Sequence, residues 1–465
     1  MSKRLILALV AVGAIGLIIG PAFAAVQNIK VSGDLEVMPL SRTAFDLKGE
    51  GENSGYAHES LILSFLRLRV DADLTDNVST TVRLLNERAW GEEATTSATV
   101  VSTDAAVDLA YVTLKEFLYS PLTLTIGRQE LHMGSEMIVG DPDTNNAVAA
   151  IDTAARGIRT QPDLSKRKAF DSIRATLNSP MDLPLVIDAI YAKINEATTT
   201  EGTTRDDETL LGLAGTYELK DMWDSMLESY FYQRIRGQDN IEVVPQEKTE
   251  ATNVFGGRVV SKPIENLVVS LEGAIQKGDY YESTNNITVD RDAWAIEAGA
   301  NYTWVKARYT PSLTALYANF SGEGKNFNAL SDSNYNGWDN MYENQSYGDI
   351  ANALLGSSNI SLVGLILNAR PTEDIGAKLA YYQYWWNKRY VQDDTIVNTA
   401  HTSSANLVMN REREVGREID ASLTYDYTED VQFGLTGGVF IPGKSFTNKN
   451  NTNATQVLGS MLVKF

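Results

Sequence analysis

Apolar and polar residues alternate along most of this chain, and the last ten residues show the pattern most simply. One face of an extended strand over residues 456–465 carries only apolar residues and glycine: Val457, Gly459, Met461, Val463 and Phe465. About ten tilted residues of this kind cover the hydrocarbon layer of a membrane. The same pattern also fits the edge strand of a soluble β-protein. A membrane strand needs a paired neighbour on each edge, so the rest of the chain must supply an even set of similar strands.

Similar alternating segments recur throughout the chain and predict 18 strands. Their expected ranges are 28–40, 59–73, 77–90, 105–119, 121–131, 168–179, 183–194, 208–220, 223–235, 252–262, 266–277, 291–304, 307–319, 358–370, 374–387, 413–428, 431–441 and 456–465. No Pro-, Ser- or Gly-rich linker divides them, so we expect a single domain.

The connections between these segments alternate between short turns and long polar loops. The short ones lie near residues 75–76, 120–121, 178–182, 220–222, 262–265, 371–373 and 429–430, and the long ones cover 41–58, 91–104, 132–167, 237–251, 321–359 and 388–412. Bacterial outer-membrane barrels have short periplasmic turns and long extracellular loops. The predicted fold is therefore an all-β, transmembrane, antiparallel β-barrel of about 18 strands. Phe465 is similar to the terminal aromatic residue by which such proteins are recognised for assembly.

Charged residues identify the inward face of the strands. In 59–73, Leu66 and Val70 share one face, whereas Arg67, Arg69 and Asp71 share the other. A charge facing lipid costs several kcal/mol near the middle of the bilayer, so the charged row must face the lumen. The same argument directs the apolar rows of 266–277, 291–304 and 413–428 outward.

Residues 1–24 are predicted to be a secretory signal peptide. Lys3 and Arg4 precede an apolar stretch, and Ala22-Phe23-Ala24 is a small-x-small cleavage site. We therefore expect residues 25–465 to form the mature barrel in a bacterial outer membrane.

The amino-acid composition limits the kinds of molecule that the protein is expected to bind. The 465-residue chain carries a net charge of −20 and no cysteine. The negative charge argues against nucleic acid and anionic membrane surfaces as partners. Without cysteine there is neither a disulfide nor a lipoprotein anchor. No pattern predicts a cofactor.

The inward face carries many basic residues, interspersed with carboxylates such as Glu272, Glu297, Glu418 and Asp420. The expected pore-lining cations are Arg67, Arg69, Arg83, Arg174, Arg234, Arg236, Arg258, Arg308 and Lys378. Two readings stay open. The charges could neutralise one another in a lattice that only holds the wall, or the guanidinium groups could form a path for anions. A barrel of this size leaves an aqueous channel in either case.

Residues 122–140 (LTLTIGRQELHMGSEMIVG) resemble the glycine–arginine–glutamine segment of the alginate-export family of outer-membrane proteins. The resemblance rests on a strand ending in Gly127, Arg128 and Gln129, on Gly134 and Gly140 in the loop that follows, and on the next strand, which begins near Phe170 and Asp171. Residues 418–420 are similar to a late-strand motif of the family, which adds Glu418 and Asp420 to the expected substrate path.

The resemblance implies a monomeric barrel of 18 strands that passes an anionic polysaccharide outward, with basic residues lining its pore and loops gating its ends. Arg128 joins the expected pore residues by resemblance only. Alternation with Leu124 and Ile126 directs it outward, so we must assume a β-bulge at Gly127. Met137 stands where the family often has a basic residue, which weakens the case for alginate itself.

Enzyme and metal chemistry find little support in the sequence. His58, His132 and His401 lie far apart in predicted loops, and no Ser/His pair stands near a strand end. Asp141, Asp143 and Asn145 could supply oxygen ligands to calcium, although such a run is also an ordinary solvated turn.

Two functions remain open. One is an exporter of an anionic, alginate-like polysaccharide, working with periplasmic secretion components in a membrane of lipid and lipopolysaccharide. The other is a general or anion-preferring diffusion porin that passes small anions.

Overall fold

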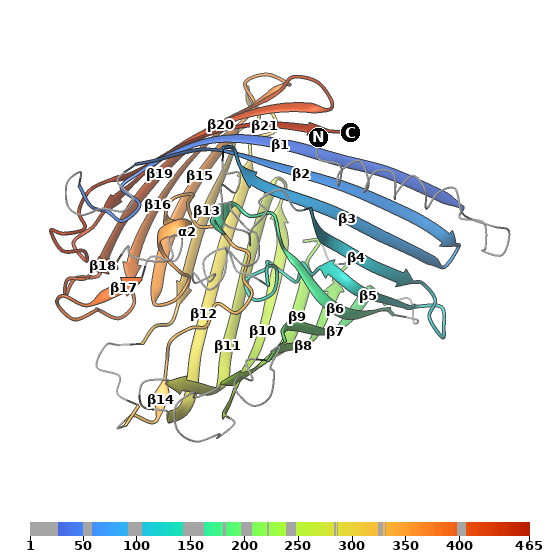
Figure 1. The fold of residues 1–465 in the computed structure, drawn as a ribbon, viewed down its shortest axis with the longest axis horizontal. Coiled ribbons are helices and arrows are strands. Elements are labelled where there is room, and N and C mark those ends of the chain that lie inside the picture. Colours follow the sequence, from blue (N-terminus) through green and yellow to red (C-terminus); the bar gives the residue numbers. More distant parts are fainter. Residues whose placement is uncertain are drawn as a thin grey trace.

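The computed structural model shows a closed antiparallel β-barrel (Figure 1). It describes residues 27–49, 58–91, 105–142, 162–179, 183–196, 207–220, 223–238, 248–282, 285, 287–323, 329–330, 332–397 and 406–465. The predicted signal peptide, residues 1–24, lies outside the described residues.

The barrel wall consists of 18 strands, as predicted. They are β1 (Asn28–Thr43), β2 (His58–Thr75), β3 (Val78–Ala89), β4 (Ala106–Leu114), β5 (Leu122–Glu130), β6 (Ala169–Asn178), β7 (Leu185–Asn195), β8 (Glu208–Glu218), β9 (Met226–Gln238), β10 (Lys248–Ile264), β11 (Leu267–Glu282), β12 (Ile287–Thr303), β13 (Ser312–Phe320), β15 (Ile360–Ala369), β16 (Ile375–Trp386), β19 (Glu414–Asp426), β20 (Val431–Pro442) and β21 (Ala454–Lys464).

The last strand closes the barrel. β21 pairs with β20 on one edge and with β1 on the other, with Val37 opposite Met461. The terminal residue extends this closure, because Phe465 and Gly33 exchange backbone hydrogen bonds of 2.8 and 3.0 Å. Closure satisfies the backbone of every edge, which is the condition for crossing lipid with strands.

The predicted faces of the strands are confirmed. On β11, Leu271 is 47% exposed on the outer surface, whereas its neighbour Glu272 is 3% exposed inside the barrel. On β19, Ile419 is 41% exposed and Glu418 is fully buried. Apolar side chains thus cover the outside, and the charged rows point inward.

Several predicted boundaries are wrong, and small elements were missed. β13 begins at Ser312 rather than near residue 307, because residues 304–310 form a turn. β10 begins four residues earlier than predicted, since its pairing with β9 continues to Lys248. The loops also contain the 3-10 helix η1 (Pro162–Leu164), β14 (Asn334–Tyr335), the helix α2 (Ala351–Leu354) and the hairpin β17 (Thr395–Val397) and β18 (Asn406–Val408). Among the described residues, no helix is long and apolar enough to cross a membrane.

Candidate functional site: the loop-filled lumen

Three loop segments fold back into the barrel at the end that carries the long loops, here the long-loop end. They are the first infolded segment (131–141), the second (162–168) and the third (336–359). Figure 1 draws α2, which belongs to the third segment, inside the ring of strands. Buried residues of the first and third segments, among them Ile138 and Ile350, share one apolar cluster with wall residues from β6 to β21. The lumen at this end is therefore packed with protein.

The first and third infolded segments are joined as one body. The backbone N–H groups of Gly140 and Asp141 donate to the carbonyl of Tyr342 at 2.7 and 3.0 Å, and the N–H of Tyr342 donates to Ile138 at 3.1 Å. A side chain at Gly140 would bring its Cβ within 2.7 Å of Asn344 Cβ, so this close approach requires glycine.

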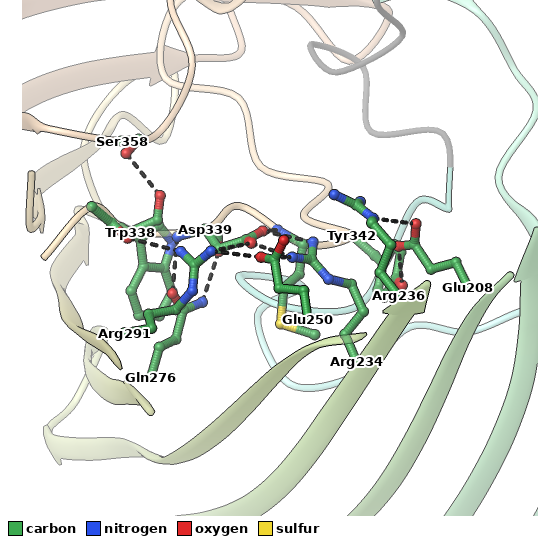
Figure 2. Close-up of polar contacts among 12 residues, drawn as sticks. Glu208, Arg234, Arg236, Glu250, Gln276, Arg291, Trp338, Asp339, Tyr342 and Ser358 are labelled. Atoms are coloured by element: carbon green, nitrogen blue, oxygen red, sulfur yellow. Dashed lines mark hydrogen bonds and ion pairs between the residues drawn. The ribbon is translucent and has the colours of Figure 1, made fainter. Parts of the chain in front are cut away.

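An arginine clasp, formed by Arg234, Arg291 and Glu250, holds the third segment to the wall at Asp339 (Figure 2). Arg234 donates to Asp339 at 2.9 Å and to Glu250 at 3.3 Å. Arg291 donates to Glu250 at 2.8 Å and lies 3.3 Å from the Asp339 carboxylate. Burial by itself raises the pKa of Asp339, but the charges of Arg234 and Arg291 outweigh it and hold the pKa below its ordinary value. Asp339 therefore stays ionised in the clasp.

Neighbouring side chains extend this attachment, as Figure 2 shows. Gln276 donates to the carbonyl of Asp339 at 2.7 Å and accepts from its N–H at 2.9 Å. Further along, the hydroxyl of Tyr342 donates to Glu208 at 2.6 Å, and Arg236 donates to the same carboxylate at 2.8 Å.

A second set of contacts binds the third segment to β12 and β19 of the wall. Glu418 on β19 accepts the backbone N–H groups of Ile350 and Ala351, both at 2.7 Å, at the start of α2. The hydroxyl of Tyr347 donates to Glu297 at 2.5 Å. Asp420, another predicted path residue, is buried next to Glu418 on the same face of β19.

The second infolded segment is attached to β1 and β3 by charges. Arg42 donates to Asp163 at 3.2 Å, and Lys166 lies 3.0 Å from Glu36. Glu87 accepts the backbone N–H of Lys166 at 2.6 Å.

His132 and Glu343, which also belong to the infolded segments, have raised pKa values. His132 donates to Glu136 at 2.7 Å and lies 3.6 Å from Glu130, and the contacts with Glu130 and then Glu136 raise its pKa to about 9. Glu343 is buried within the third segment, and burial, followed by the charge of Asp141, raises its pKa to about 8.

Most of the predicted pore arginines are paired with carboxylates. The pairs are Arg67–Asp34 at 2.9 Å, Arg69–Asp71 at 2.8 Å, Arg83–Asp108 at 2.5 Å, Arg174–Asp188 at 2.7 Å, Arg236–Glu208 at 2.8 Å and Arg258–Glu228 at 2.6 Å, together with Arg234 in the clasp. Lys378, opposite Asn368 and Ser422, has no ion pair within the described part of the chain. This arrangement matches the first of the two possibilities, in which the inward charges neutralise one another in a lattice of ion pairs. The arginine side chains of the lattice differ in how much of their surface is exposed.

Two predicted pore residues lie elsewhere. Arg308 is in the β12–β13 turn, with its guanidinium 4.6 Å from the ring centre of Tyr309, so the prediction that it lines the lumen from a strand is wrong. The register of β5 continues through Gly127 without a shift, so the assumed bulge is also wrong, although Gly127 has a φ of +124°. Arg128 pairs with Asp171 at 3.3 Å, and these two side chains are 38% and 61% exposed.

The other residues of the family-like segment support the loop packing. Gln129 donates to the carbonyls of Thr125 and Ser172, both at 3.2 Å. Gly134 lies in the first infolded segment, where Met137 is buried in the apolar cluster. Phe170 packs edge-on against Tyr342 with ring centres 5.9 Å apart.

The calcium hypothesis receives no support. Asp141 pairs with Lys168 at 2.9 Å, and Asp143 and Asn145 lie outside the described residues. No group of three or more metal-ligating side chains occurs in the part of the chain that the structure describes.

Sequence reasoning missed the clasp, because Arg291, Glu250 and Asp339 were not chosen as site residues. For the infolding itself, at the second infolded segment, one signal was present in the sequence. Leu61, Leu63 and Phe65 form an apolar run on the inward face of β2, which a water-filled lumen does not need.

Comparisons with known proteins agree with this geometry. The family model described as "Alginate export" matches residues 49–460. Among solved structures, the Pseudomonas aeruginosa proteins OccK9 (OpdG) and OccK2 (OpdF) in complex with glucuronate have similar folds, with TM-scores of 0.55 and 0.53 and identities of 10% and 11%. Each alignment covers 95% of this chain and 99% of the other. No curated protein sequence matches. The chain therefore belongs to the alginate export family and is a β-barrel channel of the bacterial outer membrane.

Proposed function

We propose that this protein exports an anionic, alginate-like polysaccharide from the periplasm to the cell exterior through the barrel lumen, without catalysis. The observation that carries the proposal is the family match over residues 49–460. The solved OccK2 complex with glucuronate adds that a barrel of similar fold holds a sugar carboxylate. In this orientation the short-turn end is periplasmic and the long-loop end is extracellular. The barrel acts as a monomer and receives the polymer from periplasmic secretion components.

The partly exposed ion pairs supply the path for the polymer. Side chains of Arg67, Arg69, Arg174 and Arg258 are 28%, 38%, 30% and 20% exposed, whereas those of Arg234 and Arg291 in the clasp are 3% exposed. A guanidinium group that is open to the lumen can exchange its carboxylate partner for a uronate of the polymer with little change in bonding. A uronate chain would thus pass from one arginine to the next.

The infolded segments close the channel when no polymer is being exported. Besides the apolar cluster, polar contacts attach them to the wall, and a passing chain of carboxylates and hydroxyls can offer the wall equivalent hydrogen bonds. The joined first and third segments would then move together, because their backbones are bonded to each other.

Efflux from proteoliposomes tests the proposal. Vesicles loaded with fluorescent oligouronates should release them through the wild-type protein faster than neutral oligosaccharides of equal length. Arg67→Gln combined with Arg174→Gln should remove that preference, because both changes neutralise exposed interior cations. Arg128→Gln is the matched control and should keep the preference. Equal release of charged and neutral oligosaccharides by the wild type would favour the general porin instead.

A further inference from the structure

A cluster of basic side chains at the long-loop end plays no part in the proposed export path. We call it the basic rim patch: Lys388, Arg389, Arg411, Arg413, Arg417 and Lys444, all of them exposed. These residues come from the segments that adjoin the ends of β16, β19 and β20. The protein as a whole is acidic, with a net charge of −20, so such a cluster stands out against its surroundings.

Backbone pairing brings the three segments together. The N–H of Trp386, just before Lys388, donates to the carbonyl of Arg413 at 2.9 Å. The N–H of Ser445, next to Lys444, donates to Glu414 at 2.8 Å. The patch is thus held by the wall of the barrel and does not depend on the placement of a free loop.

The cations of the basic rim patch differ from the interior arginines in their partners. Within the part of the chain that the structure describes, none of the six forms an ion pair. Four carboxylates lie among them in sequence, Asp393, Asp394, Glu412 and Glu414, which leaves an excess of positive charge. Asp394 accepts the N–H of its neighbour Thr395 at 2.9 Å. The patch therefore presents guanidinium and ammonium groups to an external anion.

The lipid-facing side chains of β16 and β19 show at which depth in the membrane the basic rim patch lies. Arg417 continues the outward row of β19 beyond Leu423 and Ile419, which are 53% and 41% exposed to lipid. Gln383 on β16 is its neighbour in register, and Trp385 follows on the same outward face, 36% exposed. Tryptophan at the end of a lipid-facing row marks the level of the headgroups. An arginine there extends its charge out of the hydrocarbon.

We propose that the basic rim patch binds the phosphate groups of the outer-leaflet glycolipid, the lipid A part of lipopolysaccharide. Arginine suits phosphate because its planar guanidinium donates two parallel hydrogen bonds. The position beside the lipid-facing row favours a membrane phosphate over a solute passing through the lumen. The proposal rests on the outer-membrane location of the barrel and on the extracellular position of its long-loop end given under the proposed function, and not on the identity of the exported polymer.

Binding of lipid A to purified protein in detergent tests the proposal. We expect Arg411→Gln, Arg413→Gln and Arg417→Gln together to weaken lipid A binding about tenfold or more, as measured by native mass spectrometry or titration, because charge-assisted hydrogen bonds to phosphate are lost. The matched control is Lys306→Gln, Arg308→Gln and Arg370→Gln, which removes three exposed cations at the short-turn end. Binding to this control should equal that of the wild type.

Further experiments identify the ligand and control for misfolding of the variant. Lipid A without phosphate should bind the wild type as weakly as intact lipid A binds the patch variant. The double variant Lys388→Gln, Lys444→Gln changes two patch residues outside the strands and should also weaken lipid A binding. It replaces the triple variant in the test if the triple variant fails to fold. Equal lipid A binding by the patch variant and the short-turn control would overturn the proposal. So would tighter binding of soluble oligouronates than of lipid A at the patch.

Discussion

At the scale of single residues, exposure separates two groups of arginine that are alike in sequence. Arg67 and Arg174 keep about a third of their side chains open to the lumen, whereas Arg234 and Arg291 are almost completely covered by the third infolded segment. Both groups are paired with carboxylates. The sequence alone cannot distinguish them, because the covering segment is far away along the chain.

Asp339→Asn should loosen the clasp. The change leaves Arg234 and Arg291 to share the single charge of Glu250, and breaking a buried ion pair costs about 3–5 kcal/mol. We expect more frequent and longer openings in planar-bilayer recordings. Asp292→Asn, which removes an exposed carboxylate paired with Lys277 on the outer surface, is the control and should behave as wild type. Unchanged gating in Asp339→Asn would show that the clasp does not hold the closed state.

Raising the pH should favour opening through Glu343. Its pKa rises from 4.5 in water to about 8 in the packed segment, so the packed state holds a proton that the released state gives up. Packing is therefore fully favoured below about pH 4.5, weakens as pH rises, and stops weakening above about pH 8. We expect open probability to increase over this window.

Glu343→Gln separates this effect from other titrations. The amide stays neutral, so the variant should lose the rise between about pH 4.5 and 6.5, where Glu343 titrates and His132 does not. His132, whose pKa is raised from 6.5 to about 9, acts in the same direction between these two values and should still respond in this variant. An open probability that falls as pH rises would contradict both assignments.

At the scale of elements, alternation predicted the barrel strands well because half of each strand faces lipid and half does not. Strand ends were less predictable, since pairing with a neighbour, as between β9 and β10, extends a strand beyond its own pattern. The infolded segments were expected only as parts of long polar loops. Their burial depends on contacts such as Gly140 with Tyr342, which join residues about two hundred positions apart.

Phe465→Ala should impair assembly of the barrel. The terminal ring lies close to Gly33, where an added Cβ would come within 2.7 Å of it, and the backbone of Phe465 completes the pairing with β1. We expect less folded protein in the outer membrane, measured by heat-modifiable migration in cell fractions. Normal levels of the variant would show that the last strand is not the assembly signal.

At the scale of the whole molecule, the proposed orientation of the barrel rests on its unequal connections. We predict that a cysteine replacing Lys449, in the β20–β21 loop, reacts with an impermeant reagent in intact cells. A cysteine replacing Asp76 or Glu429, in short turns, should react only after the outer membrane is disrupted. The native chain has no cysteine to interfere. The reverse labelling pattern would invert the proposed direction of transport.

The central claim, that the lumen is a path for anions, is tested most directly by the reversal potential of single channels in a salt gradient. Exposed interior arginines raise the local anion concentration over a Debye length of about 10 Å at 0.1 M salt. The account predicts anion preference at low salt that weakens at high salt, and its loss in the Arg67→Gln, Arg174→Gln double variant. A wild-type channel that prefers cations, or that shows no preference at low salt, would contradict it.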